Sequence, residues 1–168
     1  MSQFDGFGLS PSLQKALAEV GYTTPTAIQA QAIPLALNGK DLMGAAQTGT
    51  GKTAAFALPI LQRFPDTGPR PRALILAPTR ELACQIEASF RCYGKYVAAR
   101  VCVLYGGAGI KPQIQQLAQG VDIIVATPGR LMDHLERRSV DLSGVQVLVL
   151  DEADRMLDMG FEPQVRAI

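Results

Sequence analysis

Residues 145–154 read VQVLVLDEAD, and residues 41–53 read DLMGAAQTGTGKT. Each stretch is an apolar run that stops abruptly at a polar cluster. The first run ends at carboxylates, and the second ends at glycines followed by an ammonium group and a hydroxyl. Such groups hold the phosphates and the magnesium ion of a nucleoside triphosphate. The two stretches together therefore predict a protein that binds a nucleoside triphosphate with Mg²⁺.

The glycine-rich stretch carries most of this argument. Gly49 and Gly51 allow a tight turn whose backbone N–H groups point inward at phosphate oxygens. The helix expected from Lys52 adds its positive N-terminal end. Lys52 would reach the β and γ phosphates, and the Thr53 hydroxyl would ligate Mg²⁺. Ala46 departs from the general pattern G-x-x-x-x-G-K-[ST], which leaves a chance Gly-Thr-Gly-Lys-Thr turn as the alternative.

Length and composition fit one globular domain. The chain has 168 residues, of which 48% are hydrophobic and 18% charged, values typical of a folded protein. No apolar run approaches the length of a membrane span, and the N-terminus lacks the pattern of a secretory signal. The three cysteines, Cys84, Cys92 and Cys102, form no C-x-x-C pair. We therefore expect reduced thiols, a cytoplasmic protein and no zinc site.

The net charge of +1 does not by itself indicate a nucleic-acid partner. Between residues 88 and 121 there are four basic residues and no acid, whereas residues 151–162 hold five acids. A solvated helix face explains the basic block as well as phosphate contacts do.

Apolar runs and helical patterns alternate along the chain. The continuous runs predict strands over residues 41–46, 73–77, 101–105, 121–126 and 145–150, and helices are expected over residues 52–63, 80–97, 110–118 and 128–138. The class is therefore α/β with a parallel sheet, and ligands are expected at the carboxyl ends of the strands. Two further helices precede this core. Ser10 and Pro11 open the first, with Leu13, Ala16, Leu17 and Val20 as its apolar stripe, and Thr26 opens the second.

Over essentially its whole length the chain resembles the DEAD-box RNA helicases, in a bacterial form. Residues 21–29 (GYTTPTAIQ), with Phe4 upstream, look like the Q motif, and residues 46–53 match the family's own phosphate loop, in which Ala46 is ordinary. Residues 78–83 (PTRELA) are similar to motif Ia, Gly106-Gly107 to the GG turn, residues 127–130 (TPGR) to motif Ib and residues 151–154 to motif II.

The resemblance implies a RecA-like three-layer α/β/α sandwich with a mostly parallel central sheet, the fold of P-loop NTPases. It implies an N-terminal helicase domain, with residues 1–39 as a helical Q-motif extension and residues 40–168 as the P-loop core. Two parts of the family's pattern are absent from the sequence. One is the strand with the Ser-Ala-Thr segment, expected between the phosphate-loop strand and the DEAD strand. The other is the C-terminal helicase domain with its arginine fingers.

The nucleotide roles follow residue by residue. Tyr22 would stack on adenine, and Gln29 would hydrogen-bond its edge, although Thr26 and Gln29 also have the spacing of a capping box. Lys52, Asp151 and Glu152 would be catalytic, with Glu152 positioning the attacking water. Thr53 and Asp151 would hold Mg²⁺, and Asp154 would couple the motif to neighbouring loops. The implied ATP site comprises Phe4, Tyr22, Thr24, Gln29, Ala46, Gln47, Thr48, Gly49, Thr50, Gly51, Lys52 and Thr53.

The remaining motifs are implied to contact the RNA backbone. Thr79 and Thr127 are equally plausible as helix N-caps, and Arg80 and Arg130 are equally plausible as internal ion-pair partners. The implied contact residues are Pro78, Thr79, Arg80, Gly106, Gly107, Thr127, Pro128, Gly129 and Arg130.

The expected function is the ATP-binding half of an RNA helicase that couples ATP hydrolysis to local unwinding. Its expected partners are ATP, sequence-independent RNA and a C-terminal domain, with no membrane, and the isolated chain is expected to be nearly inactive. One alternative is a non-catalytic, nucleotide-dependent RNA-binding module. Another is a DNA helicase of the same superfamily, which would not require the 2′-hydroxyl.

Overall fold

The chain divides into two compact units. The computed structural model describes residues 2–47 and 49–168, so Thr48, one of the expected ATP-site residues, lies outside the described residues. Unit 1 runs to Asp66 and includes Ser89–Ala98, and unit 2 comprises Thr67–Ala88 and Ala99–Ile168. Helix α4 (Arg80–Tyr93) begins in unit 2 and ends in unit 1. In the part of the chain so described, no helix is both long enough and apolar enough to cross a membrane.

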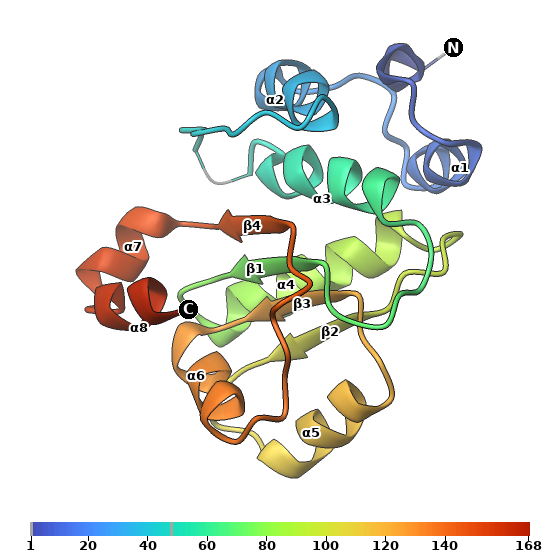
Figure 1. The fold of residues 1–168 in the computed structure, drawn as a ribbon. Helices are drawn as coiled ribbons and strands as arrows, with labels where there is room; N and C mark the ends of the chain where they lie inside the picture. The colour runs from blue at the N-terminus through green and yellow to red at the C-terminus, as the bar shows by residue number, and fades with distance from the viewer. Residues whose placement is uncertain (1, 48) are drawn as a thin grey trace. The chain divides into compact units, whose positions relative to one another are not determined.

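Unit 1 is helical. It contains the 3₁₀ helix η1 (Gln3–Phe7), α1 (Pro11–Glu19), α2 (Ala27–Leu37) and α3 (Lys52–Arg63) (Figure 1). As predicted, the Ser10 side chain caps α1 by accepting from the Leu13 N–H, and Pro11 is the first helical residue. The predicted apolar stripe is buried at Leu13, Ala16 and Leu17. Val20 is 40% exposed, because it is already the C-cap of the helix.

The prediction of a strand over residues 41–46 is wrong. This segment has no regular secondary structure, and its apolar side chains are exposed, Leu42 by 47% and Met43 fully. An apolar run becomes a strand only where a neighbouring strand completes its backbone hydrogen bonds. None of the described strands pairs with residues 41–46.

Unit 2 is built on a parallel sheet, as predicted. Its strands β1 (Ala73–Leu76), β2 (Val101–Leu104), β3 (Ile123–Ala126) and β4 (Val147–Leu150) lie in the order β2-β3-β1-β4. All the pairings are parallel, so the arrowheads in Figure 1 end at one edge of the sheet. The helices of this unit are α5 (Ile110–Ala118), α6 (Pro128–Glu136), α7 (Ala153–Asp158) and α8 (Glu162–Ala167), together with the start of α4.

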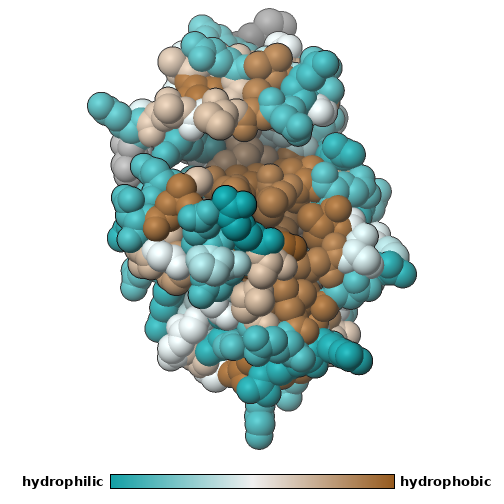
Figure 2. Space-filling model, turned by 60° about the vertical axis from the view of Figure 1, so that its left-hand side comes forward, coloured by the Kyte–Doolittle hydropathy of each residue, from teal (hydrophilic) through white to brown (hydrophobic). Residues whose placement is uncertain are grey.

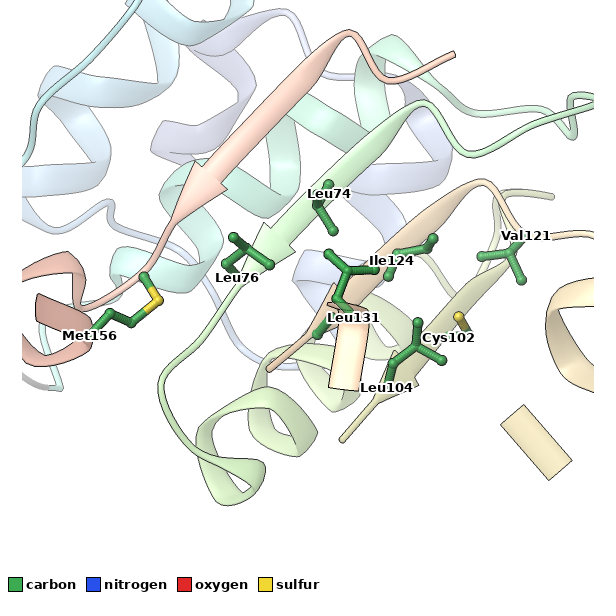
Figure 3. Close-up of a cluster of buried hydrophobic side chains, with 9 residues drawn as sticks. Leu74, Leu76, Cys102, Leu104, Val121, Ile124, Leu131 and Met156 are labelled. Atoms are coloured by element: carbon green, nitrogen blue, oxygen red, sulfur yellow. The ribbon is translucent and has the colours of Figure 1, made fainter. Parts of the chain in front are cut away.

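One face of the sheet carries the hydrophobic core of unit 2. Leu74 and Leu76 of β1 pack with Ile124 of β3, and helices α6 and α7 contribute Leu131 and Met156 (Figure 3). Partly buried side chains from α5 and α8 extend the cluster. Packing of helices over continuous apolar strands explains why these short runs form a parallel sheet.

Strand β4 forms an open edge of the sheet. The Val147 and Asp151 amides donate to the carbonyl oxygens of Arg72 and Leu76, so the amides between them at Leu148 and Leu150 point to the other side. Within the described residues no strand pairs there, and Leu148 and Leu150 are 55% and 40% exposed. They share the sheet face of Leu74 and Leu76, their partners in register. Figure 2 shows hydrophobic residues gathered at the surface on one face of the molecule.

The amino ends of the strands are held by the carboxylate of Asp122, whose side chain is fully buried. Its Oδ2 accepts from the Arg100 backbone N–H and Nε, at 2.7 and 3.0 Å, and its Oδ1 accepts from the Gly68 N–H and from Arg72. Burial raises the pKa of Asp122, but the hydrogen bonds from Arg100 and Gly68 outweigh burial and leave that pKa below its ordinary value. The charged form is therefore the one that stabilises the fold.

Replacing Asp122 tests this role. Asp122→Asn places an amide N–H₂ group among donors, so we expect a loss of about 3 kcal/mol in the free energy of unfolding. A group with a lowered pKa in the folded state stabilises at pH values above its unfolded pKa, and this contribution disappears as the pH falls through the folded value. The difference in the free energy of unfolding between the wild-type protein and Asp122→Asn, measured by urea titration, should therefore become smaller below about pH 4.

The matched control for this change is Asp141→Asn. Asp141 pairs with Arg70 at 3.7 Å in an exposed position, so we expect little change in stability. Equal losses for the two variants would contradict the role assigned to Asp122.

Candidate nucleotide and RNA sites

The phosphate loop of unit 1 ends in the backbone shape that anion binding needs. Gly49 and Gly51 have φ angles of 84° and 79°, which side-chain-bearing residues rarely adopt. Gly51 is the N-cap of α3 and has no side chain to cap the helix. No side-chain hydrogen bond therefore caps the N-terminus of this helix. Lys52 and Thr53 follow in this turn, half-buried. Lys52 forms no hydrogen bond or ion pair with any residue that the structure describes, so its ammonium is available to an anion.

Gln29 connects helix α2 to this loop. Its Oε1 accepts from the Thr26 N–H at 3.0 Å, which completes the capping box, and its Nε2 donates to the Gly51 carbonyl at 3.2 Å. A Cβ at Gly51 would collide with the Gln29 amide, so only glycine fits there. The capping-box interpretation is therefore confirmed. One N–H and one lone pair of the amide are left for a base.

The aromatic residues upstream form a stack in the same unit. The rings of Phe4 and Tyr22 are stacked with centroids 6.0 Å apart, and the Tyr22 hydroxyl is hydrogen-bonded to that of Tyr93 at 3.0 Å. Phe4 is only 1% exposed, so in this structure it packs against Tyr22 and does not face a ligand, although the sequence placed it among the ATP-site residues. Tyr22 is half-buried and Thr24 is exposed. Of the two stacked rings, Tyr22 is thus the one that can meet a base.

In unit 2, four loops meet at the carboxyl edge of the sheet. Residues 78–80 follow β1, Gly106-Gly107 follow β2, residues 127–130 follow β3 and residues 151–154 follow β4. Because all four strands are parallel, these segments lie along one edge. The sheet thus brings together four motifs that lie far apart in the sequence, from residue 78 to residue 154.

The first two loops contact each other. The Thr79 hydroxyl accepts from the Leu82 N–H at 3.2 Å, so Thr79 caps α4 as predicted. The Arg80 guanidinium lies over the Tyr105 ring, 4.6 Å from its centroid, in a cation–π contact. Arg80 itself is exposed, as are Gly106 and Gly107, whereas Pro78 is buried. Their exposure leaves Arg80 and the two glycines accessible to a phosphate backbone.

The third loop differs from its prediction in two ways. Thr127 is the N-cap residue of α6, but its side chain makes no capping hydrogen bond. Arg130 is largely buried and turned inward, with its Nη1 and Nη2 atoms each 3.0 Å from the Ala108 carbonyl oxygen. It also pairs with Asp133 at 3.6 Å. The structure therefore favours the internal alternative for Arg130. Gly129 is exposed and Pro128 is buried.

The fourth loop carries the carboxylates. Asp151 Oδ1 accepts from the Glu152 N–H at 3.1 Å, and both residues are half-buried. Glu152 has a left-handed backbone (φ 49°, ψ 51°), a strained conformation that is frequent at functional sites. Its carboxylate pairs with Arg155 at 3.3 Å. Asp154 is exposed and contacts no other described residue through a hydrogen bond or ion pair, so its coupling role stays a prediction.

Comparison with known proteins agrees with these motifs. The family model described as DEAD/DEAH box helicase matches residues 26–168. The chain belongs to the DEAD/DEAH box helicase family. It is 49% identical over 166 residues to the ATP-dependent RNA helicase DeaD of Mycobacterium tuberculosis, covering 98% of this chain and 30% of that protein.

Two further helicases of the family give the same result. The ATP-dependent RNA helicase CshA of Limosilactobacillus reuteri is 51% identical over 166 residues, covering 99% of this chain and 33% of that protein. The DEAD-box ATP-dependent RNA helicase 30 of Arabidopsis thaliana is 51% identical over 174 residues, covering 100% of this chain and 29% of that protein. The chain thus spans about a third of the length of these relatives or less.

Sequence reasoning missed one residue that the structure places beside the helicase motifs. Gln113 of α5 is buried, and it hydrogen-bonds to the loop after β2 and to Arg130. Its partners lie 8 and 17 residues away along the chain, so no local pattern marks it. The only signal in the sequence is that this glutamine occupies a position on the core-facing side of the predicted helix.

Variants of Gln29 separate its capping role, which the structure shows, from the predicted recognition of a base. Gln29→Glu keeps the acceptor for the Thr26 N–H but loses the donor to Gly51, whereas Gln29→Ala loses both. We expect both variants to lose the preference for ADP over GDP in calorimetry, since a hydrogen-bonding site discriminates through the groups that it pairs. Only Gln29→Ala should also weaken helix α2, measured as a lower melting temperature. An unchanged ADP/GDP ratio in Gln29→Glu would contradict base recognition by Gln29.

Proposed function

We propose that this chain is the ATP-binding domain of an RNA helicase, which binds ATP with Mg²⁺ and the backbone of single-stranded RNA. The observation that carries the proposal is the carboxyl edge of the unit 2 sheet, where the four strands are followed by four helicase motifs. In the full-length protein, we propose, this domain works with a C-terminal helicase domain to couple ATP hydrolysis to local RNA unwinding. As the proposed domain division, residues 1–39 form the Q-motif extension and residues 40–168 the P-loop core.

The nucleotide half of the proposal rests on unit 1. The amides of the loop and of the first turn of α3 favour negative charge, and Lys52 adds a full positive charge to them. Gln29 and Tyr22 supply a polar edge and an aromatic face for the adenine base. Thr24 and the remaining loop residues complete the proposed site.

Mg²⁺ fits the donors that the chain offers. Magnesium prefers oxygen ligands, usually one or two carboxylates, hydroxyls and waters beside the substrate phosphates. Asp151 ends β4 with a half-buried carboxylate, and Thr53 carries a hydroxyl in the first turn of α3. We propose these two residues as ligands, in part through water. The ion would neutralise charge on the phosphates.

Glu152 is the proposed base for the attacking water. Its carboxylate follows the proposed magnesium ligand directly, and its backbone is held in the left-handed conformation. The Arg155 guanidinium lies 3.3 Å from the carboxylate and limits its rotamers. Glu152 would therefore orient water and accept its proton.

The RNA half of the proposal rests on unit 2. Its carboxyl edge offers exposed glycines, an exposed arginine and helix N-termini, which are groups that contact phosphates and not bases. In the described part of these loops the aromatic ring is that of Tyr105, which is half-buried and already contacts the Arg80 guanidinium, so it is not an open stacking platform for bases. The proposed RNA contact is thus indifferent to sequence. We also propose a cytoplasmic location, which the three free cysteines favour, because thiols stay reduced there.

The first test separates nucleotide binding from hydrolysis. Lys52→Ala removes a charged hydrogen bond to phosphate, so ADP affinity should fall about 10- to 100-fold in calorimetry. Glu152→Gln should leave that affinity nearly unchanged, because the glutamate acts on water. The 168-residue chain should not turn ATP over measurably with RNA present, because an arginine finger worth about 10³–10⁵ in rate belongs to a second domain. RNA-stimulated turnover abolished by Glu152→Gln would contradict this division of roles.

The second test concerns RNA. For single strands the slope of log K against log salt is about −0.7 per phosphate neutralised, so three contacts predict a slope of about −2. Arg80→Gln should remove one phosphate contact and so reduce the magnitude of the slope by about 0.7. Arg166→Gln on the exposed surface of α8 should leave the slope unchanged. Oligonucleotides of uridine, adenosine and cytidine should bind alike in fluorescence anisotropy. A base preference that persists at high salt would contradict a backbone-directed site.

A further inference from the structure

The GG turn is held at both ends by side chains from other elements. The Gln113 Nε2 donates to the Tyr105 carbonyl at 3.0 Å, and Arg130 donates to the Ala108 carbonyl through both terminal nitrogens. Tyr105 and Ala108 flank the two glycines directly. Gly106 and Gly107 are themselves exposed, and a Cβ at either would meet no atom within 4 Å. Thus the flanking carbonyls are fixed inward while the glycines face solvent.

Gln113 joins these two anchors. Its Oε1 lies 3.1 Å from Arg130 Nη1 and 3.0 Å from His134 Nε2. Arg130 can only donate, so the atom that it meets must be the amide oxygen, and this fixes the orientation of the glutamine. The same oxygen then requires His134 to carry its proton on Nε2. The His134 Nδ1 is left as an acceptor, 2.7 Å from the Ser139 hydroxyl, which also lies 3.1 Å from the His134 carbonyl oxygen.

The centre of this network is buried, and its histidine is uncharged. His134 is fully buried and Gln113 is 7% exposed. Burial lowers the pKa of His134, and the neighbouring charge of Arg130 lowers it further, so the ring is neutral at pH 7. The bonds from His134 and from Arg130 to the Gln113 oxygen therefore each have one possible direction. The Gln113 amide has a partner for its Nε2 and two for its Oε1, and such a buried, hydrogen-bonded group is firmly fixed.

From this geometry we propose that Gln113 is a positioning residue for the RNA-binding surface, holding the GG turn and Arg130 in one fixed arrangement. Arg130 then acts as an internal anchor of this surface, and the charge offered to phosphate comes from Arg80 and from backbone amides of the turn. The inference rests on the proposed RNA-binding function and adds a residue outside the recognised motifs. It requires that loosening the turn weakens RNA binding without affecting the phosphate loop in unit 1.

The test compares variants of Gln113 with the same changes at Gln115, an exposed residue of the same helix. Gln113→Met keeps the side-chain volume and removes all three hydrogen bonds. We expect its affinity for a uridine oligonucleotide to fall about five- to tenfold, while its ADP affinity stays unchanged. Amide hydrogen exchange over residues 105–109 should become faster. Gln115→Met should show none of these effects.

Gln113→Glu tests the same positioning role if Gln113→Met does not fold. The carboxylate still accepts from Arg130 and His134 but cannot donate to Tyr105, so only the link to one end of the turn is lost. We expect a smaller loss of RNA affinity than in Gln113→Met, after correction by Gln115→Glu for the added charge. Exchange should become faster near Tyr105.

The outcomes separate two failures. A wild-type chain that binds no RNA in this assay would overturn the proposed function. Wild-type RNA binding that Gln113→Met and Gln113→Glu leave equal to their Gln115 controls would overturn the positioning role and leave the proposed function standing.

Discussion

The buried carboxylate of Asp122 is the interaction on which the geometry of unit 2 depends. Asp122 lies just before β3, and its partners Arg72 and Arg100 lie just before β1 and β2. The Arg72 carbonyl in turn accepts from Gln146 and Val147 at the start of β4. One ion cluster and its backbone bonds therefore set where all four strands begin. Because strands of equal length that begin together also end together, the four motif loops reach the same edge.

The two ends of the sheet use charge differently. At the amino edge, the buried carboxylate of Asp122 pairs with the partly exposed side chains of Arg72 and Arg100, and this cluster holds the register. At the carboxyl edge, Arg80, Gly106, Gly107 and Gly129 are exposed, and inward-turned Arg130 and Gln113 support the turn between them. Exposed binding groups that are held in place by hydrogen-bonded residues beneath them are the arrangement expected of a preorganised binding surface. The same division appears in unit 1, where buried Gln29 and Phe4 support the phosphate loop and Tyr22.

Much of this fold could be predicted from the sequence, because the strands β1 to β4 are continuous apolar runs bounded by polar residues. Helix α4 ends at Tyr93 and not at residue 97, since Gly94 follows and lies close to the Phe90 carbonyl. The run at 41–46 was a misleading signal, because hydrophobicity does not report whether a partner strand is present. The short helices α7 and α8 were not predicted, since six-residue helices carry too few apolar repeats to show a period.

The residues of the candidate sites also differ in how far they could be predicted from the sequence. Residues that act through local shape, such as Gly51 and the Thr26–Gln29 capping box, were visible in the sequence because their partners are close or their conformation is unusual. Residues that act across the fold were not. Asp122 meets Arg100 over 22 positions and Gln113 meets His134 over 21, and only the folded sheet brings them together. The inward orientation of Arg130 likewise follows from a carbonyl at Ala108 that no motif includes.

We propose that RNA binds through its backbone along the carboxyl edge of the unit 2 sheet. Backbone amide chemical shifts, measured while a uridine oligonucleotide is titrated into the chain, test it most directly. We expect shifts at residues 79–80, 106–109 and 129–130, and none at the amino edge around residues 120–122 and 144–146. Shifts concentrated at the amino edge, or confined to unit 1, would contradict it.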